Sequence, residues 1–434
     1  MFRVAAILSL IFCSVPRVNA DPGNPVAVRW WGQGMVSIET YWNQCVVIDP
    51  YALRIGYDDP HVRGDLVLAT HEHFDHNNVE LVSGDPSVMR GLDENGKVQD
   101  VHHRLDRLPD EEKAQWRDYK RWINRDSHAI EVTSIPSWHD DKQGSERGAN
   151  AMFLIEVDGV RIVHCGDLGQ TRLTNEQLEA LGRVDLLLIP VGGKYTIDGQ
   201  QASVIVRQLN PRRVVPIHYK TPALAIDLDG VEPFLDALRI DHEIVRPAGN
   251  TVAIRSTAGR EPSRPQVFVL GYRPWEMPPE MAKLFAAMET ANRAAQAVFA
   301  PLSIAQMNHR PSDGTHTPRW NAEHMMGREL GFFSEIYAEL DPELVKIDLN
   351  PAQMPPDYVA AHPDWTGAEE ARQIERVSEF TRRFSYLLAD LELDEQAPGS
   401  RWILPGLLEQ MERHYGEHTA NVKKKFELPD WPTQ

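Results

Sequence analysis

The chain has a deficit of positive charge, few cysteines and, beyond its first twenty residues, no long apolar run. A formal net charge of −18 excludes the broad basic surface that nonspecific nucleic-acid binding needs, so we expect no nucleic-acid partner. Only Cys45 and Cys165 lie beyond residue 20, and one distant pair gives little ground for a disulfide. No later stretch reaches the ~20 apolar residues that a membrane-spanning helix needs.

The first twenty residues have the three-part layout of a secretory signal peptide. Arg3 precedes an apolar run over 4–15, and Val18-Asn19-Ala20 stands just before Asp21. A membrane anchor is the alternative, but the apolar run is shorter than the ~20 residues of a spanning helix. We therefore predict a signal peptide at 1–20, cleavage after Ala20, and an exported protein, periplasmic or extracellular.

At 434 residues the chain is too long for one ordinary core, and its pattern changes near the middle. Residues 21–256 alternate short apolar strands with turns and helices, which predicts an α/β domain. A charged stretch at about 92–127 interrupts them as an insertion, and 257–270 has the composition of a linker. Residues 271–434 predict an all-α four-helix bundle. Its expected helices are about 278–298, 318–341, 367–391 and 403–426.

The clearest chemical signal is THEHFDH, at 70–76, directly after the apolar run Leu66-Val67-Leu68. Imidazole nitrogens and carboxylate oxygens are ligands for Zn²⁺, and also for Mn²⁺ or Fe²⁺. In a turn leaving a sheet edge, His71 and His73 can face one metal while Asp75 and His76 face its neighbour. A chance surface cluster of histidines is the alternative, which this grouping at a strand end disfavours.

This stretch resembles the HxHxDH signature of the metallo-β-lactamase superfamily. The resemblance covers roughly residues 26–256 and implies an αββα sandwich with a dinuclear metal centre. It also implies ligands after later strands: His139 in SIPSWHDD, Asp167 in VHCGDLG and His218 in VVPIHYKT. The implied assignment is His71, His73 and His139 on one metal, Asp75, His76 and His218 on the other, and Asp167 as the bridge.

Two neighbouring divalent metals can share a hydroxide and polarise a substrate oxygen. Water on zinc already has a pKa near 7, so hydroxide is available without a protein base. We assign Asp167 to the catalytic centre as the bridge, and Asp75 as a ligand that can also orient the nucleophile. Asp49, in VVIDPY, is expected to accept a hydrogen bond from the N–H of a metal-binding imidazole, on the side away from the metal. The alternative is that Asp49 only forms the turn at the end of its strand.

Several motifs look like the superfamily branch of ascorbate-6-phosphate lactonase and the phosphodiesterase that cleaves N-acyl-phosphatidylethanolamine. Among them are PVGGKYTIDGQQA and PIHYKT. In these stretches Gly192 and Gly193 could let the backbone approach a ligand, and Tyr195 and Lys220 could contact an oxyanion or phosphate. The resemblance implies hydrolysis of a phosphodiester or lactone-type ester, with a small-molecule or lipid-like substrate.

The predicted bundle has histidines of its own. His414 and His418, four residues apart, share a helix face, and His324 lies in the second helix. The alternative for such a pair is a solvated helix face. Residues about 275–427 resemble the DinB-like metal-binding bundles, which implies one divalent metal, zinc or nickel, on these three imidazoles. The bundle could then be a metal-dependent thiol transferase, or the chain a noncatalytic metal-binding protein.

Overall fold

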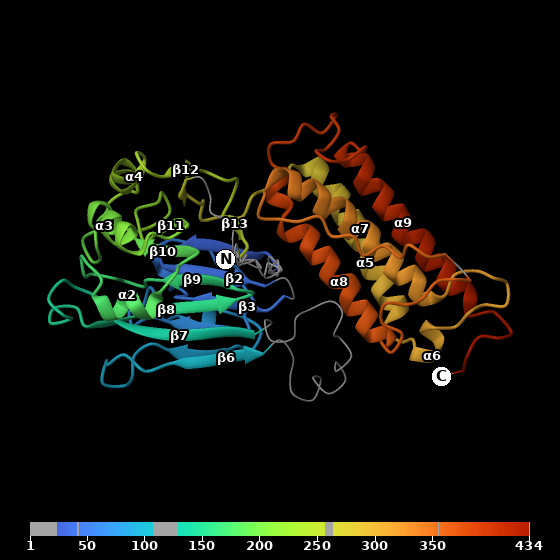
Figure 1. The fold of residues 1–434 in the computed structure, drawn as a ribbon, viewed down its shortest axis with the longest axis horizontal. Coiled ribbons are helices and arrows are strands. Elements are labelled where there is room, and N and C mark those ends of the chain that lie inside the picture. The colour runs from blue at the N-terminus through green and yellow to red at the C-terminus, as the bar shows by residue number, and fades with distance from the viewer. Residues whose placement is uncertain (1–23, 41–42, 107–128, 257–263, 355, 434) are drawn as a thin grey trace, which may run out of the picture.

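The computed structural model describes residues 24–40, 43–106, 129–256, 264–354 and 356–433. The predicted signal peptide at 1–20 lies outside these ranges, as does most of the expected insertion, at 107–128. Figure 1 shows a β-sandwich and, beside it, a bundle of long helices formed by the C-terminal part of the chain. The predicted combination of an α/β part and an all-α part is therefore observed in the described residues.

A six-stranded sheet forms one layer of the sandwich. In spatial order its strands are β13 (Thr251–Ile254), β1 (Val26–Gly32), β2 (Met35–Glu39), β3 (Cys45–Ile48), β4 (Leu66–Ala69) and β5 (Ser87–Arg90). Pairing is antiparallel from β13 to β3 and parallel from β3 to β5. All four residues of β3 and of β4 are buried, which explains their continuous apolar sequence.

The second layer has eight strands. In spatial order they are β12 (Glu243–Val245), β14 (Gln266–Phe268), β11 (Arg213–Ile217), β10 (Leu186–Pro190), β9 (Val160–His164), β8 (Ala149–Val157), β7 (Ala129–Trp138) and β6 (His102–Asp106). The two sheets share one apolar core, so the predicted metallo-β-lactamase-type sandwich is confirmed. Three helices add to this core: α2 (Asn175–Leu181), α3 (Gly199–Leu209) and α4 (Glu232–Leu238).

The expected linker at 257–270 differs from the prediction. Residues 266–268 form strand β14, which pairs in parallel with both β11 and β12. Val267 is fully buried in the sandwich core, and this burial outweighs the linker-like composition around it. Residues 257–263 lie outside the described part of the chain.

Four long helices form the bundle, close to the predicted ranges. They are α5 (Pro279–Phe299), α7 (Pro318–Leu340), α8 (Gly367–Arg383) and α9 (Leu404–Lys425), with a short α6 (Ile304–Met307) and a 3-10 turn η3 (Ser385–Leu388). The α8 helix starts at a capping box in which Thr366 and Glu369 satisfy each other's backbone N–H groups. Within the described residues, no helix has both the length and the apolarity required to cross a membrane.

The bundle covers part of the outer face of the six-stranded sheet. Ala27 on β1 and Ala253 on β13 belong to the apolar cluster of the bundle, whereas their neighbours on these strands face the sandwich core. Arg383, at the end of α8, donates to the carbonyl oxygen of Thr40 at 2.9 Å and to Glu39 at 3.2 Å. The C-terminal half thus supplies part of an outer helical layer of the sandwich. Cys45 and Cys165 are both buried free thiols.

Candidate metal centre

The HxHxDH side chains lie in the loop that leaves strand β4. Three further strands of the other sheet end nearby, and each is followed by one predicted ligand: His139 after β7, Asp167 after β9 and His218 after β11. Seven side chains, predicted from the sequence as ligands, gather into two groups in which all the ligand atoms lie within 4.8 Å of one another. The groups are His71, His73, His139 and Asp167, and Asp75, His76 and His218.

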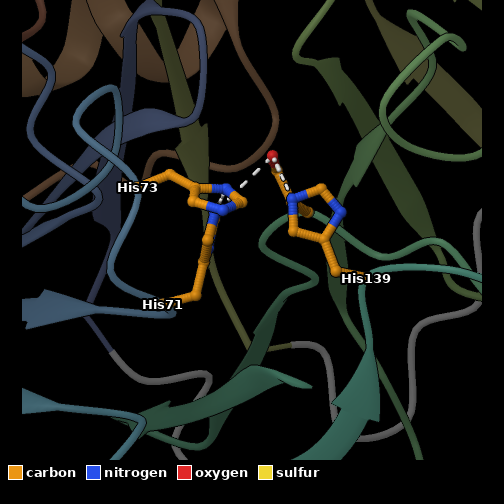
Figure 2. A group of neighbouring side chains, drawn as sticks. His71, His73 and His139 are labelled. Atoms are coloured by element: carbon orange, nitrogen blue, oxygen red, sulfur yellow. Dashed lines mark hydrogen bonds and ion pairs between the residues drawn. The ribbon is translucent and has the colours of Figure 1, made fainter. Parts of the chain in front are cut away.

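The first group centres on three imidazoles and one carboxylate oxygen. His71 Nε2 and His73 Nδ1 are 3.0 Å apart, and His139 Nε2 lies 3.2 Å from Asp167 Oδ2. Figure 2 shows the rings of His71, His73 and His139 turned toward one another. His71, His139 and Asp167 are buried, whereas His73 is on the exposed side. This arrangement leaves an approach to the group from solvent.

The second group takes the other oxygen of the same carboxylate. Asp167 Oδ1 lies 3.2 Å from His76 Nε2 and 3.3 Å from His218 Nε2. Asp75 Oδ2 is 3.7 Å from His76 Nε2 and accepts a hydrogen bond from Gln33 Nε2 at 2.9 Å. Asp167 therefore presents one oxygen to each group, which is the geometry expected of a carboxylate between two cations.

The donor atoms in this cluster fit a metal. His76 Nε2, His139 Nε2 and Asp167 Oδ1 are buried and have no hydrogen-bond partner within the described residues. Buried polar atoms without partners are costly, and their convergence calls for a cation that they can bind together. Imidazole nitrogen with carboxylate oxygen is a donor set for zinc, manganese or iron.

Asp49 supports the ligands from behind. Its carboxylate accepts hydrogen bonds from the Thr70 backbone N–H at 2.7 Å, from Thr70 Oγ1 at 2.7 Å and from His76 Nδ1 at 2.9 Å. Thr70 Oγ1 also lies 2.9 Å from His71 Nδ1. With the Nδ1 atoms of His71 and His76 held in this way, their Nε2 lone pairs face the centre.

The pKa values of the residues in the cluster are shifted in different directions. Burial and the neighbouring His76 hold the pKa of His71 well below its usual range. Burial also disfavours charge on His76, but Asp167 and Asp49 outweigh it and raise the pKa of His76 to about 10. Burial opposes ionisation of Asp167 as well, yet His218 and His76 hold its pKa well below the usual range. The Asp167 carboxylate is thus held ionised, the form that binds a cation.

Other supporting residues were not found from the sequence. Besides Gln33, the side chain of Asn150 accepts a hydrogen bond from the Asp167 backbone N–H at 3.0 Å. A Cβ on Gly34 would lie 2.6 Å from the His76 ring, and one on Gly169 would lie 2.3 Å from the His139 backbone. Their roles depend on contacts between distant segments, so no local pattern marks them.

The four predicted substrate residues have different surroundings. A Cβ on Gly192 would come within 2.2 Å of the His218 carbonyl oxygen. Only glycine therefore fits at position 192 while the backbone of the predicted ligand His218 keeps its place. Gly193 has φ +59°, where glycine is favoured. Tyr195 is 47% exposed. Lys220 Nζ donates to the carbonyl oxygens of Leu224 and Ile226 at 2.5 and 2.9 Å, so its ammonium is held by its own loop.

The three bundle histidines also meet. Ligand atoms of His324, His414 and His418 lie within 4.8 Å of one another. His324 Nδ1 is 2.7 Å from Asn350 Oδ1, and His418 Nδ1 is 2.7 Å from Asn321 Oδ1. His414 Nε2 is buried with no hydrogen-bond partner within the described part of the chain. The cluster is therefore built and oriented, unlike a pair of histidines on a solvated helix face.

Comparison with known proteins finds relatives of the N-terminal half of the chain. The family model of the Beta-lactamase superfamily domain matches residues 27–218. A UPF0173 metal-dependent hydrolase of Thermococcus onnurineus is 28% identical over 207 residues, 46% of this chain and 88% of that protein. The structure of a Thermotoga maritima protein of the metallo-beta-lactamase superfamily has a TM-score of 0.39 and 25% identity, over 56% of this chain and 98% of that one.

A UPF0173 metal-dependent hydrolase of Methanoregula boonei is 30% identical over 220 residues, 48% of this chain and 89% of that protein. The match falls on the half that carries the His and Asp cluster described above. Through this half, the chain belongs to the UPF0173 metal-dependent hydrolases of the metallo-β-lactamase superfamily.

Proposed function

We propose that this hydrolase uses two metal ions to cleave a phosphodiester or lactone-type ester. The observation that carries the proposal is the carboxylate of Asp167, whose two oxygens face two separate ligand groups. Two divalent ions, with zinc as our first choice and manganese or iron as alternatives, would supply Lewis acidity and a source of hydroxide near neutral pH.

The chain's own residues then position the reactants. Asp75 is nearly buried, is held by Gln33 and lies beside His76, so its carboxylate can orient the attacking water. Asp49 and Thr70 fix the imidazoles of His71 and His76, which reduces the reorganisation needed when a substrate binds.

The rim of the centre supports an ester with both anionic and apolar parts. Phe74 is 44% exposed within the ligand loop, with the guanidinium of Arg54 4.2 Å from its ring centroid. Tyr195 is also exposed, and the guanidinium of Arg147 lies 6.0 Å from its ring centroid. Guanidinium groups favour phosphate oxygens and the exposed rings favour hydrocarbon, so we place a small-molecule or lipid-like ester here.

Hydrolysis of model substrates tests this assignment. We expect the zinc-loaded full chain to cleave bis(p-nitrophenyl) phosphate or an aromatic lactone, to lose this activity with a chelator and to regain it with metal. His61→Ala, which changes an exposed histidine with 86% of its side chain accessible, is the control and should be fully active. Absence of turnover on both substrates, with two metals bound per chain, would contradict the proposed ester class.

The proposal includes export, because the sequence predicts a signal peptide at 1–20. We expect the N-terminus of protein from its native host to be Asp21, outside the cytoplasm. N-terminal sequencing checks this, and a chain that retains its leader would contradict it.

We also propose that the C-terminal part is a DinB-like bundle that holds one divalent metal, zinc or nickel. The supporting observation is the pair of asparagine amides that fix Nδ1 of His324 and His418 and leave Nε2 of each free to bind. The bundle would then act as a thiol transferase or as a noncatalytic metal site. Replacing His414 and His418 together by alanine should remove one metal equivalent and leave the N-terminal centre loaded.

A further inference from the structure

A cavity of about 140 Å³ lies beside the bundle histidines, between α7 and the start of α9. Its wall includes the imidazoles of His324 and His414, so the cavity reaches the proposed metal site directly. Phe332 and Met411 supply an apolar side. A ligand in this space would therefore contact both the three-histidine cluster and a hydrocarbon surface.

Two arginines make the cavity cationic. Arg328 follows His324 by one helical turn on α7, and Arg401 precedes α9. Arg328 lies 5.9 Å from the ring centroid of Phe332, and Arg401 lies 5.5 Å from that of Trp402. Neither guanidinium donates a hydrogen bond or forms an ion pair within the part of the chain that the structure describes. Both are therefore available to an anion, in a chain that carries a net charge of −18.

Two further polar atoms at this cavity have no partner. Trp402 Nε1 and His414 Nε2 are both buried, and neither has a hydrogen-bond partner within the described residues. An indole N–H can only donate, so its missing partner must be an acceptor atom. Buried polar atoms are normally paired, and an unpaired one indicates an absent water, ion or ligand.

We infer that this cavity binds a small organic dicarboxylate. One carboxylate accepts from Trp402 Nε1 and pairs with Arg401 or Arg328, the short carbon chain lies against Phe332 and Met411, and the second carboxylate reaches the metal on the three histidines. The inference rests on the proposed bundle metal site for that second contact. A carboxylate suits the planar guanidinium groups, and the apolar wall favours an organic anion over inorganic phosphate.

Calorimetric titration with malonate tests the inference. The protein is the full chain with His71→Ala, His73→Ala, His76→Ala and His218→Ala, which removes imidazoles from both N-terminal ligand groups. It is loaded with Co²⁺ so that its visible spectrum reports on the bundle metal. We expect malonate to bind and to change the cobalt spectrum, while the neutral isostere malonamide binds at least tenfold more weakly. Equal affinity for malonamide would overturn the inference, since charge would then play no part.

Arginine variants locate the site. Arg328→Gln with Arg401→Gln should retain the cobalt ion and weaken malonate at least tenfold, and Trp402→Phe should weaken it severalfold with no change in charge. Arg293→Gln is the matched control, because this exposed α5 arginine pairs with Thr290 and is not part of the cavity wall. Circular dichroism verifies that each variant is folded, and unchanged affinity in the folded arginine double variant would overturn the inference.

The same titration separates this inference from the metal site on which it rests. If the bundle takes up no cobalt but malonate still binds and depends on the two arginines, the metal site fails and the anion cavity stands. If cobalt binds to the three histidines but neither the spectrum nor the calorimetry responds to malonate, the metal site stands and the dicarboxylate assignment fails.

Discussion

The two histidine clusters of this chain are built in different ways. The N-terminal ligands lie on loops that follow four separate strands, and they meet only because two sheets pack face to face. The bundle ligands lie on two helices, where a spacing of four residues already aligns His414 with His418. A site on loops that follow several strands can gather more ligands. A site on helices needs fewer contacts between distant segments of the chain, because helix spacing already aligns part of its ligands.

The clusters also differ in charge. The N-terminal centre contains Asp75 and Asp167, with Asp49 behind them, which suits two cations. The bundle cluster has three imidazoles and no carboxylate, and Arg328 and Arg401 line the cavity beside it. Burial, with the nearby His324 and Arg328, lowers the pKa of His414 to about 4. The metal that we propose for the bundle would therefore take its balancing anion from outside the cluster.

The largest expected effect comes from the bridging carboxylate. Asp167→Asn keeps the size of the side chain but removes the negative charge that offsets two divalent cations. Two such cations repel each other by roughly 17 kcal/mol at ~4 Å and an effective dielectric of ~20. We expect loss of one metal equivalent and a fall in hydrolysis of at least ~10²-fold, as for other electrostatic stabilisers. Metal analysis and turnover on the same sample measure both.

Asp141→Asn is the matched control for this change, because Asp141 is an exposed acid two residues from His139. It should retain both metals and full turnover. An Asp167→Asn protein with two metals and unchanged activity would rule out the bridged centre. The carboxylate charge would then no longer distinguish the N-terminal cluster from the bundle cluster.

The sequence predicted one cluster better than its surroundings. Local pattern alone located His71, His73, Asp75 and His76, because they follow one buried strand. Resemblance to a family was needed for His139, Asp167 and His218, which are distant in the chain.

The rest depends on tertiary contacts that no local pattern records. Gln33 reaches Asp75 across 42 positions of the chain, and Asn150 holds the backbone of Asp167. The composition around strand β14 predicts a linker because it hides a three-residue strand whose central Val267 is buried between neighbouring strands. The carbonyl oxygens of Leu224 and Ile226, which accept from the Lys220 ammonium, also come from contacts that the sequence does not indicate.

Removing the supports should affect the two clusters unequally. Asp49→Ala deletes three hydrogen bonds, including that of His76 Nδ1, so we expect metal affinity of the N-terminal centre to fall by about 100-fold, the upper end of the range for such supports. Asn321→Ala removes the contact with His418 Nδ1 and a hydrogen bond to the Thr317 carbonyl oxygen. Because one neutral amide is lost at the metal site, we expect the metal affinity of the bundle to fall by about 10-fold, the lower end of the range for such supports. Competition with a chromophoric chelator measures both constants. Equal losses at the two sites would contradict the view that charge on the support distinguishes them.

The smallest effect concerns buried acids away from either cluster. Asp167 is held ionised, but Glu329 in the bundle core has a raised pKa, because burial disfavours its charge and its hydrogen-bond partners Tyr415, Thr381 and Asn292 are neutral. Tyr415 Oη and Thr381 Oγ1 donate to it at 2.6 and 2.7 Å. Between its usual pKa of 4.5 and the raised value, the folded state binds more protons than the unfolded state. Unfolding free energy should therefore fall as pH rises through this window, by at most about 1.4 kcal/mol per pH unit.

Glu329→Gln removes this titration and keeps an acceptor for one hydroxyl group. We expect urea unfolding of the full chain to lose this part of its pH dependence, so that the variant and the parent differ most in slope between pH 5 and the raised pKa. Glu335→Gln, a substitution at a less buried acid of α7 that pairs with Lys346, is the control and should keep the parental slope. If Glu329→Gln leaves the slope unchanged, Glu329 is already ionised in the folded protein. The buried carboxyl groups of Glu329 and Asp167 would then have the same charge state, and this difference between the two halves of the chain would be wrong.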